Sequence, residues 1–251
     1  MCLLLCFKLI SSPHVLQSKH EDNVIKHAKL VEVVREMTTN GINNVKFDHL
    51  LMVDALERLG LDYHYDDEIN LILEQCYLQI VKKGFIEHGN LYEVSLSFRI
   101  LRQRGFRVSA DVFELFKGKN GKFIENLEYD IRGLMELYEA SHLSIEGEDV
   151  LHEAAKFSSH MLQKTLSSLD VKEEKRVKHT LENPHRTNFT YFSLLNSTKE
   201  FDAPILKELA EPECMIAQPV RKMEINEVLR CISEYSFIII FNNDHKIVTQ
   251  T

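Results

Sequence analysis

A pair of adjacent carboxylates, Asp66 and Asp67, is the first place in this sequence where metal chemistry is conceivable. A helix that holds a diphosphate through Mg²⁺ needs carboxylates at its first, second and fifth positions, because that spacing puts the oxygen ligands on one face. Asn70 occupies the fifth position. Acidic residues also favour the N-terminal end of any helix, where the dipole is positive. The spacing therefore predicts a helix start rather than a magnesium site.

Two other pairs resemble fragments of metal motifs. His152 and Glu153 begin an HExxH frame, but Lys156 stands where the second zinc-binding histidine should be. We predict a partly exposed helix face there. Asn243 and Asp244 are followed by no hydroxyl or glutamate at the spacing of a second magnesium site, and we interpret them as a turn.

The stretch 117–123 (KGKNGKF) has the glycines and lysines of a phosphate-binding loop. A P-loop also needs a glycine five residues before Gly121 and a hydroxyl residue after Lys122. Phe116 and Phe123 occupy those positions, so we predict a basic surface turn between two helices. No Ser/His/Asp or Cys/His arrangement stands out among the twelve histidines. The residues by themselves thus give no catalytic, metal-binding or substrate-binding position.

Composition excludes several classes of function. The chain has 251 residues, no tryptophan and a formal net charge of -8, which leaves no electrostatic footprint for nucleic acid. Segment 1–10 resembles the short apolar core of a signal peptide, but it has no basic residues before it and no clear cleavage site until the weak Ser11-Ser12, so a secretory signal is the less favoured alternative. Segment 236–241 is far shorter than the about 20 apolar residues of a membrane span. Five cysteines without a CxxC pair favour reduced thiols in the cytoplasm over a disulfide framework: Cys2, Cys6, Cys76, Cys214 and Cys231.

Between about residues 20 and 230 the apolar residues recur with helical spacing, which indicates an all-α chain. The clearest helix is 66–83, which has acids in its first turn, Lys82 and Lys83 in its last turn, and Gly84 as a left-handed stop. Its apolar face consists of Ile69, Ile72, Leu73, Cys76 and Ile80.

Further helices of ten to twenty residues, joined by short turns, predict antiparallel hairpins. Glycines at 60 and 105 end two of them, and Asn90 and Ser109 cap the starts of two. The predicted ranges are 48–59, 91–104, 109–116, an apolar stripe over 127–138, 148–166, 172–182, 202–210 and 221–234. Polar, turn-forming residues at 183–202 mark the best candidate domain boundary. Segment 233–251 is β-prone and shows no helical face.

Three blocks of this sequence resemble the N-terminal domain of plant terpene synthases: 56–69 (LERLGLDYHYDDEI), 91–113 (LYEVSLSFRILRQRGFRVSADVF) and 130–151 (DIRGLMELYEASHLSIEGEDVL). They occur in the family's order, and the resemblance extends over roughly residues 24–230. It implies an α-barrel of helical hairpins without catalytic residues. In the family, catalysis belongs to a C-terminal helical domain, where DDxxD and NSE/DTE-type motifs hold Mg²⁺ against the substrate diphosphate.

The resemblance places Asp66 and Asp67 outside the family's magnesium site. Residues 206–230 resemble the start of the C-terminal domain, but Cys231 and Ile232 follow where relatives continue with an Arg-Trp-Trp stretch. We therefore expect the chain to stop short of the catalytic domain and to consist of five parts. These are a segment 1–19 that is unrelated or disordered, an α-barrel domain at 20–183, a linker at 184–201, the start of a truncated C-terminal domain at 202–230, and a non-family tail at 231–251.

The family resemblance implies a terpene synthase, a carbon–oxygen lyase that ionises and cyclises a prenyl diphosphate. Farnesyl diphosphate is favoured as the substrate of the parent enzyme, and geranyl diphosphate stays open. A complete family member would use Mg²⁺ or Mn²⁺, whereas we expect no cofactor and no activity for this chain alone, because both metal motifs are missing from its sequence. The alternative is a non-catalytic binding or scaffold module that associates with a full-length synthase through exposed apolar surface. We expect a cytoplasmic location and neither nucleic-acid nor membrane partners.

Overall fold

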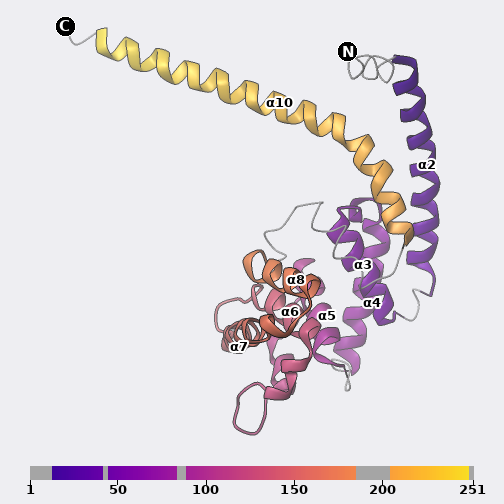
Figure 1. The fold of residues 1–251 in the computed structure, drawn as a ribbon, viewed down its shortest axis with the longest axis vertical. Helices are drawn as coiled ribbons and strands as arrows, with labels where there is room; N and C mark the ends of the chain where they lie inside the picture. The colour runs from indigo at the N-terminus through magenta and orange to yellow at the C-terminus, as the bar shows by residue number, and fades with distance from the viewer. Residues whose placement is uncertain (1–12, 42–44, 84–88, 185–203, 249–251) are drawn as a thin grey trace. The chain divides into compact units, whose positions relative to one another are not determined.

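The computed structural model describes residues 13–41, 45–83, 89–184 and 204–248 (Figure 1). Within these ranges the chain forms helices and no β-strand, and an isolated antiparallel bridge joins Lys117 and Phe123. The chain is therefore all-α, as predicted. Its helices are α2 (Pro13–Thr39), α3 (Phe47–Leu59), η2 (Asp62–His64), α4 (Asp66–Lys83), α5 (Leu91–Gln103), η3 (Ala110–Phe116), η4 (Glu125–Tyr129), α6 (Ile131–Ser141), α7 (Asp149–Thr165), η5 (Leu166–Ser168), α8 (Val171–Glu182) and α10 (Pro204–Val248).

The helices divide into two compact units. One unit comprises residues 1–34 and 204–251, and so contains most of α2 together with α10. The other unit, residues 35–203, contains α3 to α8.

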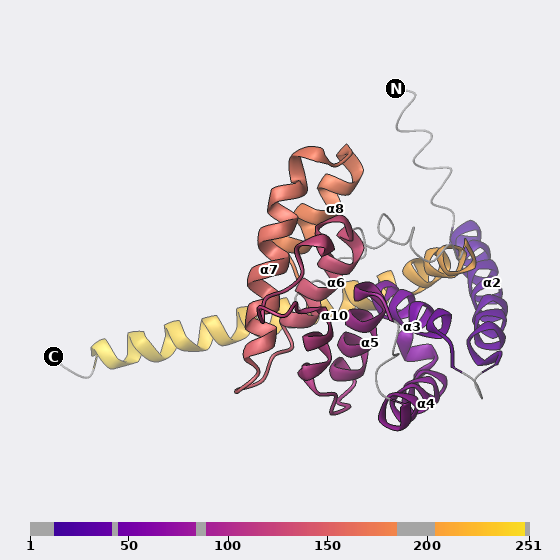
Figure 2. The ribbon, with the colours of Figure 1, turned by 90° about the horizontal axis from the view of Figure 1, so that it is seen from below.

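The larger unit is built from helices that pack on their neighbours in the chain. Helix α6 lies between α5 and α7 and packs against both (Figure 2). Helix α3 packs against α4 and α5. Residues three or four apart on these helices share a face, and most of those that face inward are apolar. Fully buried examples are Leu96, Ile100, Leu134, Leu137 and Leu151.

Local signals in the sequence locate the helix ends correctly. Gly60 ends α3 in the left-handed conformation, with φ 64°. The side-chain oxygen of Asn90 accepts a hydrogen bond from the backbone N–H of Glu93 at 2.9 Å and caps α5. Ser109 caps η3 through the N–H of Asp111, so the short helix predicted there is a 3₁₀ helix. Helices α7 and α8 match their predicted ranges to within one residue at each end.

Helix α4 has the predicted bounds and the predicted inner face. Ile69, Ile72 and Leu73 are fully buried, Cys76 is 6% exposed and Ile80 is half-buried. Gly84, the expected stop, lies outside the described residues.

The apolar stripe over 127–138 belongs to two helices rather than one. Asp130 interrupts it, because the side chain of Asp130 accepts a hydrogen bond from the N–H of Gly133 at 2.8 Å and so begins α6 as its N-cap. Leu127 consequently lies in η4, whereas Leu134 is in the core of α6.

Helix α10 contradicts two predictions. The helices expected at 202–210 and 221–234 are one continuous helix, and the β-prone segment is helical from residue 233 to Val248. Asn243 and Asp244 therefore lie within a helix and not in a turn. Extending a helix adds one hydrogen bond per residue without a new nucleation cost. A lone strand would leave its N–H and C=O groups unpaired, so local β-propensity does not decide this segment.

In the smaller unit, α2 contacts the start of α10 through polar side chains. Lys26 pairs with Glu208 at 3.1 Å, and the imidazole Nε2 of His27 lies 2.6 Å from Glu213 Oε2. Apolar residues of both helices are buried, namely Leu30 and Val34 on α2 and Leu206, Leu209 and Ala210 on α10. Among the residues that the structure describes, none of the helices has the length and apolarity needed to cross a membrane.

Candidate functional site

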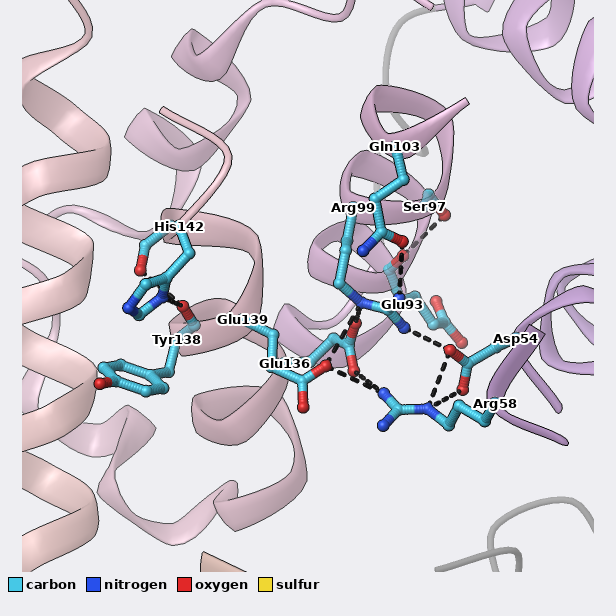
Figure 3. Close-up of polar contacts among 11 residues, drawn as sticks. Asp54, Arg58, Glu93, Ser97, Arg99, Gln103, Glu136, Tyr138, Glu139 and His142 are labelled. Atoms are coloured by element: carbon cyan, nitrogen blue, oxygen red, sulfur yellow. Dashed lines mark hydrogen bonds and ion pairs between the residues drawn. The ribbon is translucent and has the colours of Figure 1, made fainter. Parts of the chain in front are cut away.

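The most prominent polar site in the larger unit is a set of five charged side chains between α3, α5 and α6 (Figure 3). We call it the buried charge cluster, and it consists of Asp54, Arg58, Arg99, Glu136 and Glu139. Helical spacing positions its members, because Asp54 and Arg58 are four residues apart on α3, and Glu136 and Glu139 are three apart on α6. Each pair therefore shares a helix face, and Arg99 reaches them from α5.

Arg99 is the centre of this cluster and has no solvent exposure. Its Nε donates to Glu136, and its Nη2 donates to Asp54. Its Nη1 donates to the side-chain oxygen of Gln103 at 3.0 Å. One guanidinium thus links helices whose contacting residues lie 37 and 45 positions away in the sequence.

Arg58 forms the second link between α3 and α6. Its Nε donates to both carboxylate oxygens of Asp54, at 2.8 and 3.0 Å. Its Nη2 donates to Glu139 at 3.0 Å and lies 3.6 Å from Glu136. Burial alone lowers the pKa of both guanidiniums, but the surrounding carboxylates outweigh burial and raise the pKa of Arg58 and of Arg99 above its ordinary value. Both arginines therefore stay protonated, and neither can act as a general acid.

Glu136 is the cluster member whose charge is least favourable. It is 5% exposed, and burial raises its pKa to about 7 even though Arg99 and Arg58 favour the ionised form. A carboxyl with this pKa has the proton affinity of a general acid or base, but it is enclosed by three helices. The geometry cross-links helices and offers no access to a substrate.

Two further arginines, Arg102 in the last turn of α5 and Arg104 just after it, connect α5 to neighbouring segments. Arg102 donates to the carbonyl oxygen of Val108 at 2.6 and 2.9 Å, to that of Leu143 at 3.1 Å, and to Glu148. The hydrogen bonds that Glu148 accepts from Arg102 and from the backbone N–H of Ile145, with burial opposing them, lower the pKa of Glu148. Arg102 thereby joins the end of α5 to the loop that leads into α7.

Arg104 pairs with one member of the acidic pair that could have bound a metal. It pairs with Glu57 at 2.7 Å, with Asp62 at 2.9 Å and with Asp66 at 3.2 Å. Asp66 and Asp67 open helix α4 as predicted, and both are exposed. The carboxylate of Asp66 therefore pairs with a guanidinium.

The fragment of an HExxH frame and the 117–123 turn lie at the surface, where their side chains form ion pairs. His152 and Glu153 lie on the exposed face of α7, as expected, and Glu153 pairs with Lys117 at 2.6 Å. Lys117 also pairs with Glu114 at 2.9 Å, at the base of the 117–123 turn. That turn connects η3 to η4 on the surface, so the predicted basic turn is confirmed.

Sequence reasoning missed the buried charge cluster. A periodicity analysis counts charged residues as the exposed face of a helix, whereas Arg99, Glu136 and Glu139 lie in the interior. The available signal was Arg99 itself, which stands between the apolar residues Phe98 and Ile100 of α5.

Fold and site together define an all-α protein whose helices are joined by internal ion pairs. The family profile described as "Terpene synthase, N-terminal domain" matches residues 5–181. The chain therefore belongs to the terpene synthase family. The match begins inside segment 1–19, which the sequence analysis had set apart, and residues 13–19 of that segment are helical.

Relatives and solved structures agree with this assignment. The chain is 39% identical over 224 residues to "Probable terpene synthase 4" of Ricinus communis, covering 84% of this chain and 38% of that protein. The isoprene synthase of grey poplar leaves (Populus x canescens) superposes with a TM-score of 0.75 at 31% identity, covering 90% of this chain and 43% of that one. The same enzyme with three Mg²⁺ ions and dimethylallyl-S-thiolodiphosphate superposes with a TM-score of 0.71 at 31% identity over 88% and 42%. The chain thus spans about two fifths of the length of these relatives.

Proposed function

We propose that these 251 residues form the N-terminal part of a terpene synthase that ionises and cyclises a prenyl diphosphate, and that they do not catalyse this reaction alone. The observation that carries the proposal is the family match over residues 5–181 in a chain without a DDxxD motif. The similar isoprene synthase binds Mg²⁺ and a diphosphate analogue, which supports the same substrate class for a complete protein. We propose farnesyl diphosphate as the first substrate to test.

Among the residues that the structure describes, the acidic pair of α4 does not suit the Mg²⁺ or Mn²⁺ ions that the family reaction needs. Ionisation of an allylic diphosphate requires metal ions to neutralise the leaving group and a closed apolar cavity to protect the carbocation. The acidic pair of α4 offers one carboxylate that pairs with Arg104, and Asn70 occupies the position of the third ligand. We therefore assign no catalytic step to any residue described above.

The test is direct incubation of the purified chain with Mg²⁺ and either farnesyl or geranyl diphosphate. Volatile products are measured by gas chromatography and mass spectrometry against a sample without protein and against a full-length relative. We expect product from the relative only. Product from this chain above the protein-free control would refute the proposal of inactivity.

A second function, a binding module for a full-length synthase, is favoured by an apolar stripe on α10, within residues 222–232, which are all exposed. Ile225, Val228, Leu229 and Ile232 recur at helical spacing and are 56–60% exposed. Contiguous apolar surface of this kind is typical of protein interfaces. We propose that the helical catalytic domain of a synthase covers this face.

Co-purification with a tagged full-length relative tests the binding module. We expect a fixed stoichiometry that is lost when Val228→Asn and Leu229→Asn are combined, and that survives Glu227→Gln on the same exposed turn. Capture without fixed stoichiometry, or equal capture of both variants, would count against a specific interface. A cytoplasmic location is also part of this proposal, and imaging of a fluorescent fusion of the chain would test it.

A further inference from the structure

We infer that the buried charge cluster is a proton-linked lock. Glu136 holds a proton in the folded chain and loses it as the pH rises, and its ionisation weakens the attachment of α6 to α3 and α5. On ionisation the carboxylic acid of Glu136 becomes a carboxylate and its proton goes to the solvent. The lock needs no ligand, and it is independent of the proposed catalytic role of a complete synthase.

The first support is that the two arginines next to Glu136 also bind other carboxylates. Arg99 donates to Glu136 and also to Asp54. Arg58 lies 3.6 Å from Glu136 but donates to Asp54 and Glu139 at 2.8 to 3.0 Å. Each guanidinium that Glu136 contacts is thus also bound by another carboxylate. Glu136 consequently receives only part of the compensation that an ionised buried carboxylate requires.

The second support is like charge at short range. Glu139 follows Glu136 on the same helix by three residues, and its Oε2 lies 3.6 Å from the Nε of Arg99, the nitrogen that donates to Glu136. Two carboxylates that share one cation favour protonation of one of them. The charged groups that act on Glu136 are Asp54 and Arg58 from α3, Arg99 from α5 and Glu139 from α6, and Gln103 of α5 bonds to Arg99.

The third support is the exclusion of water. Glu136 is 5% exposed and Arg99 is 0% exposed, so water compensates little of the charge of an ionised Glu136. The pair between Arg102 and Glu148 provides a contrast within the same unit. Glu148 accepts from both terminal nitrogens of one guanidinium, and there the pKa of the carboxyl is lowered instead.

The direction of the pH effect follows from this arrangement. The pKa of Glu136 is raised above its ordinary value of 4.5 by burial, to about 7. Its contribution to folding is therefore fully present below pH 4.5 and is lost as the pH rises through about 7. Above that pH the new carboxylate also repels Glu139 and Asp54, which are part of the same cluster.

The experiment compares the urea midpoint of the full chain at pH 5.5, 7 and 8.5 for wild type, Glu136→Gln and Glu153→Gln. Glutamine has the shape of the protonated acid and cannot ionise, and Glu153 is an exposed glutamate in the same unit. We expect the midpoint of Glu136→Gln relative to wild type to rise between pH 5.5 and pH 8.5, and the difference between Glu153→Gln and wild type to stay constant over the same range. Parallel pH profiles for wild type and Glu136→Gln would overturn the inference.

A second measurement covers the case in which Glu136→Gln does not fold. Infrared spectroscopy of the wild-type chain detects the carbonyl stretch of a protonated carboxyl group directly. We expect such a band in the folded protein at pH 6, and we expect it to decrease as the sample is titrated to pH 8.5. A spectrum that holds no protonated carboxyl at pH 6 would overturn the inference on its own.

Discussion

Replacement of Arg99 by methionine tests how much the buried charge cluster contributes to stability. Methionine keeps most of the length and apolar volume of the arginine but removes every donor. Glu136 and Asp54 then lose the guanidinium that bridges α5 to α6 and α3. Removing one partner of a buried ion pair costs about 3–5 kcal/mol, chiefly because the other charge stays buried without compensation. Arg99 is completely buried, so solvent does not reduce this loss.

The expected result is a large fall in thermal stability. For chains of this size a loss of 1 kcal/mol lowers Tm by about 2–4 °C, so we expect a decrease of about 6–20 °C by circular dichroism at pH 7.5. Arg107→Met is the matched control, because Arg107 is exposed in the same unit and surface substitutions usually change stability by about 0.5 kcal/mol or less. The deficit of Arg99→Met should shrink at pH 5.5, where the uncompensated carboxyls can take up protons. A Tm for Arg99→Met within the range of Arg107→Met would refute the reasoning, and a deficit that does not change with pH would assign the loss to packing.

Three smaller predictions concern single side chains. Burial raises the pKa of the Cys76 thiol to about 11, so a thiol-alkylating reagent at pH 8 should label exposed Cys231 much faster than Cys76. Peptide mass spectrometry measures the two labelling rates, and equal rates would contradict this prediction. Asn90→Ala removes the cap of α5 and should cost about 1 kcal/mol in urea unfolding, whereas Asn90→Ser should retain most of the stability because serine also caps helices. Gly133→Ala should destabilise the chain by about 1–3 kcal/mol, because the new Cβ would overlap the carboxylate of Asp130 and come within 3.0 Å of Leu91 Cβ. Helix propensity alone predicts a gain of about 1 kcal/mol instead, and a measured gain would show that the neighbouring side chains move aside easily.

The sequence by itself determined the features that depend on residues within one or two helical turns. Gly60 ends α3 because only glycine adopts a left-handed backbone at no steric cost, and Asn90 begins α5 because its side chain reaches an N–H three residues on. The inner face of α4 followed from apolar spacing alone. The three blocks of family resemblance were likewise visible without coordinates, and the family match over residues 5–181 confirms them. That resemblance placed Asp66 and Asp67 outside the magnesium site before their contacts with the rest of the chain were known.

Only the tertiary structure decided where distant residues meet. Arg99 is 45 positions from Asp54 and 37 from Glu136, and their contact depends on how three helices are rotated about their axes, which no local pattern fixes. For the segment from 233 to 248, local β-propensity gave the wrong secondary structure. Its residues continue an existing helix, which satisfies their backbone hydrogen bonds. Local interactions set the ends and faces of the helices. The cost of burying charge and backbone polar groups, which is felt only in the assembled fold, determined the rest.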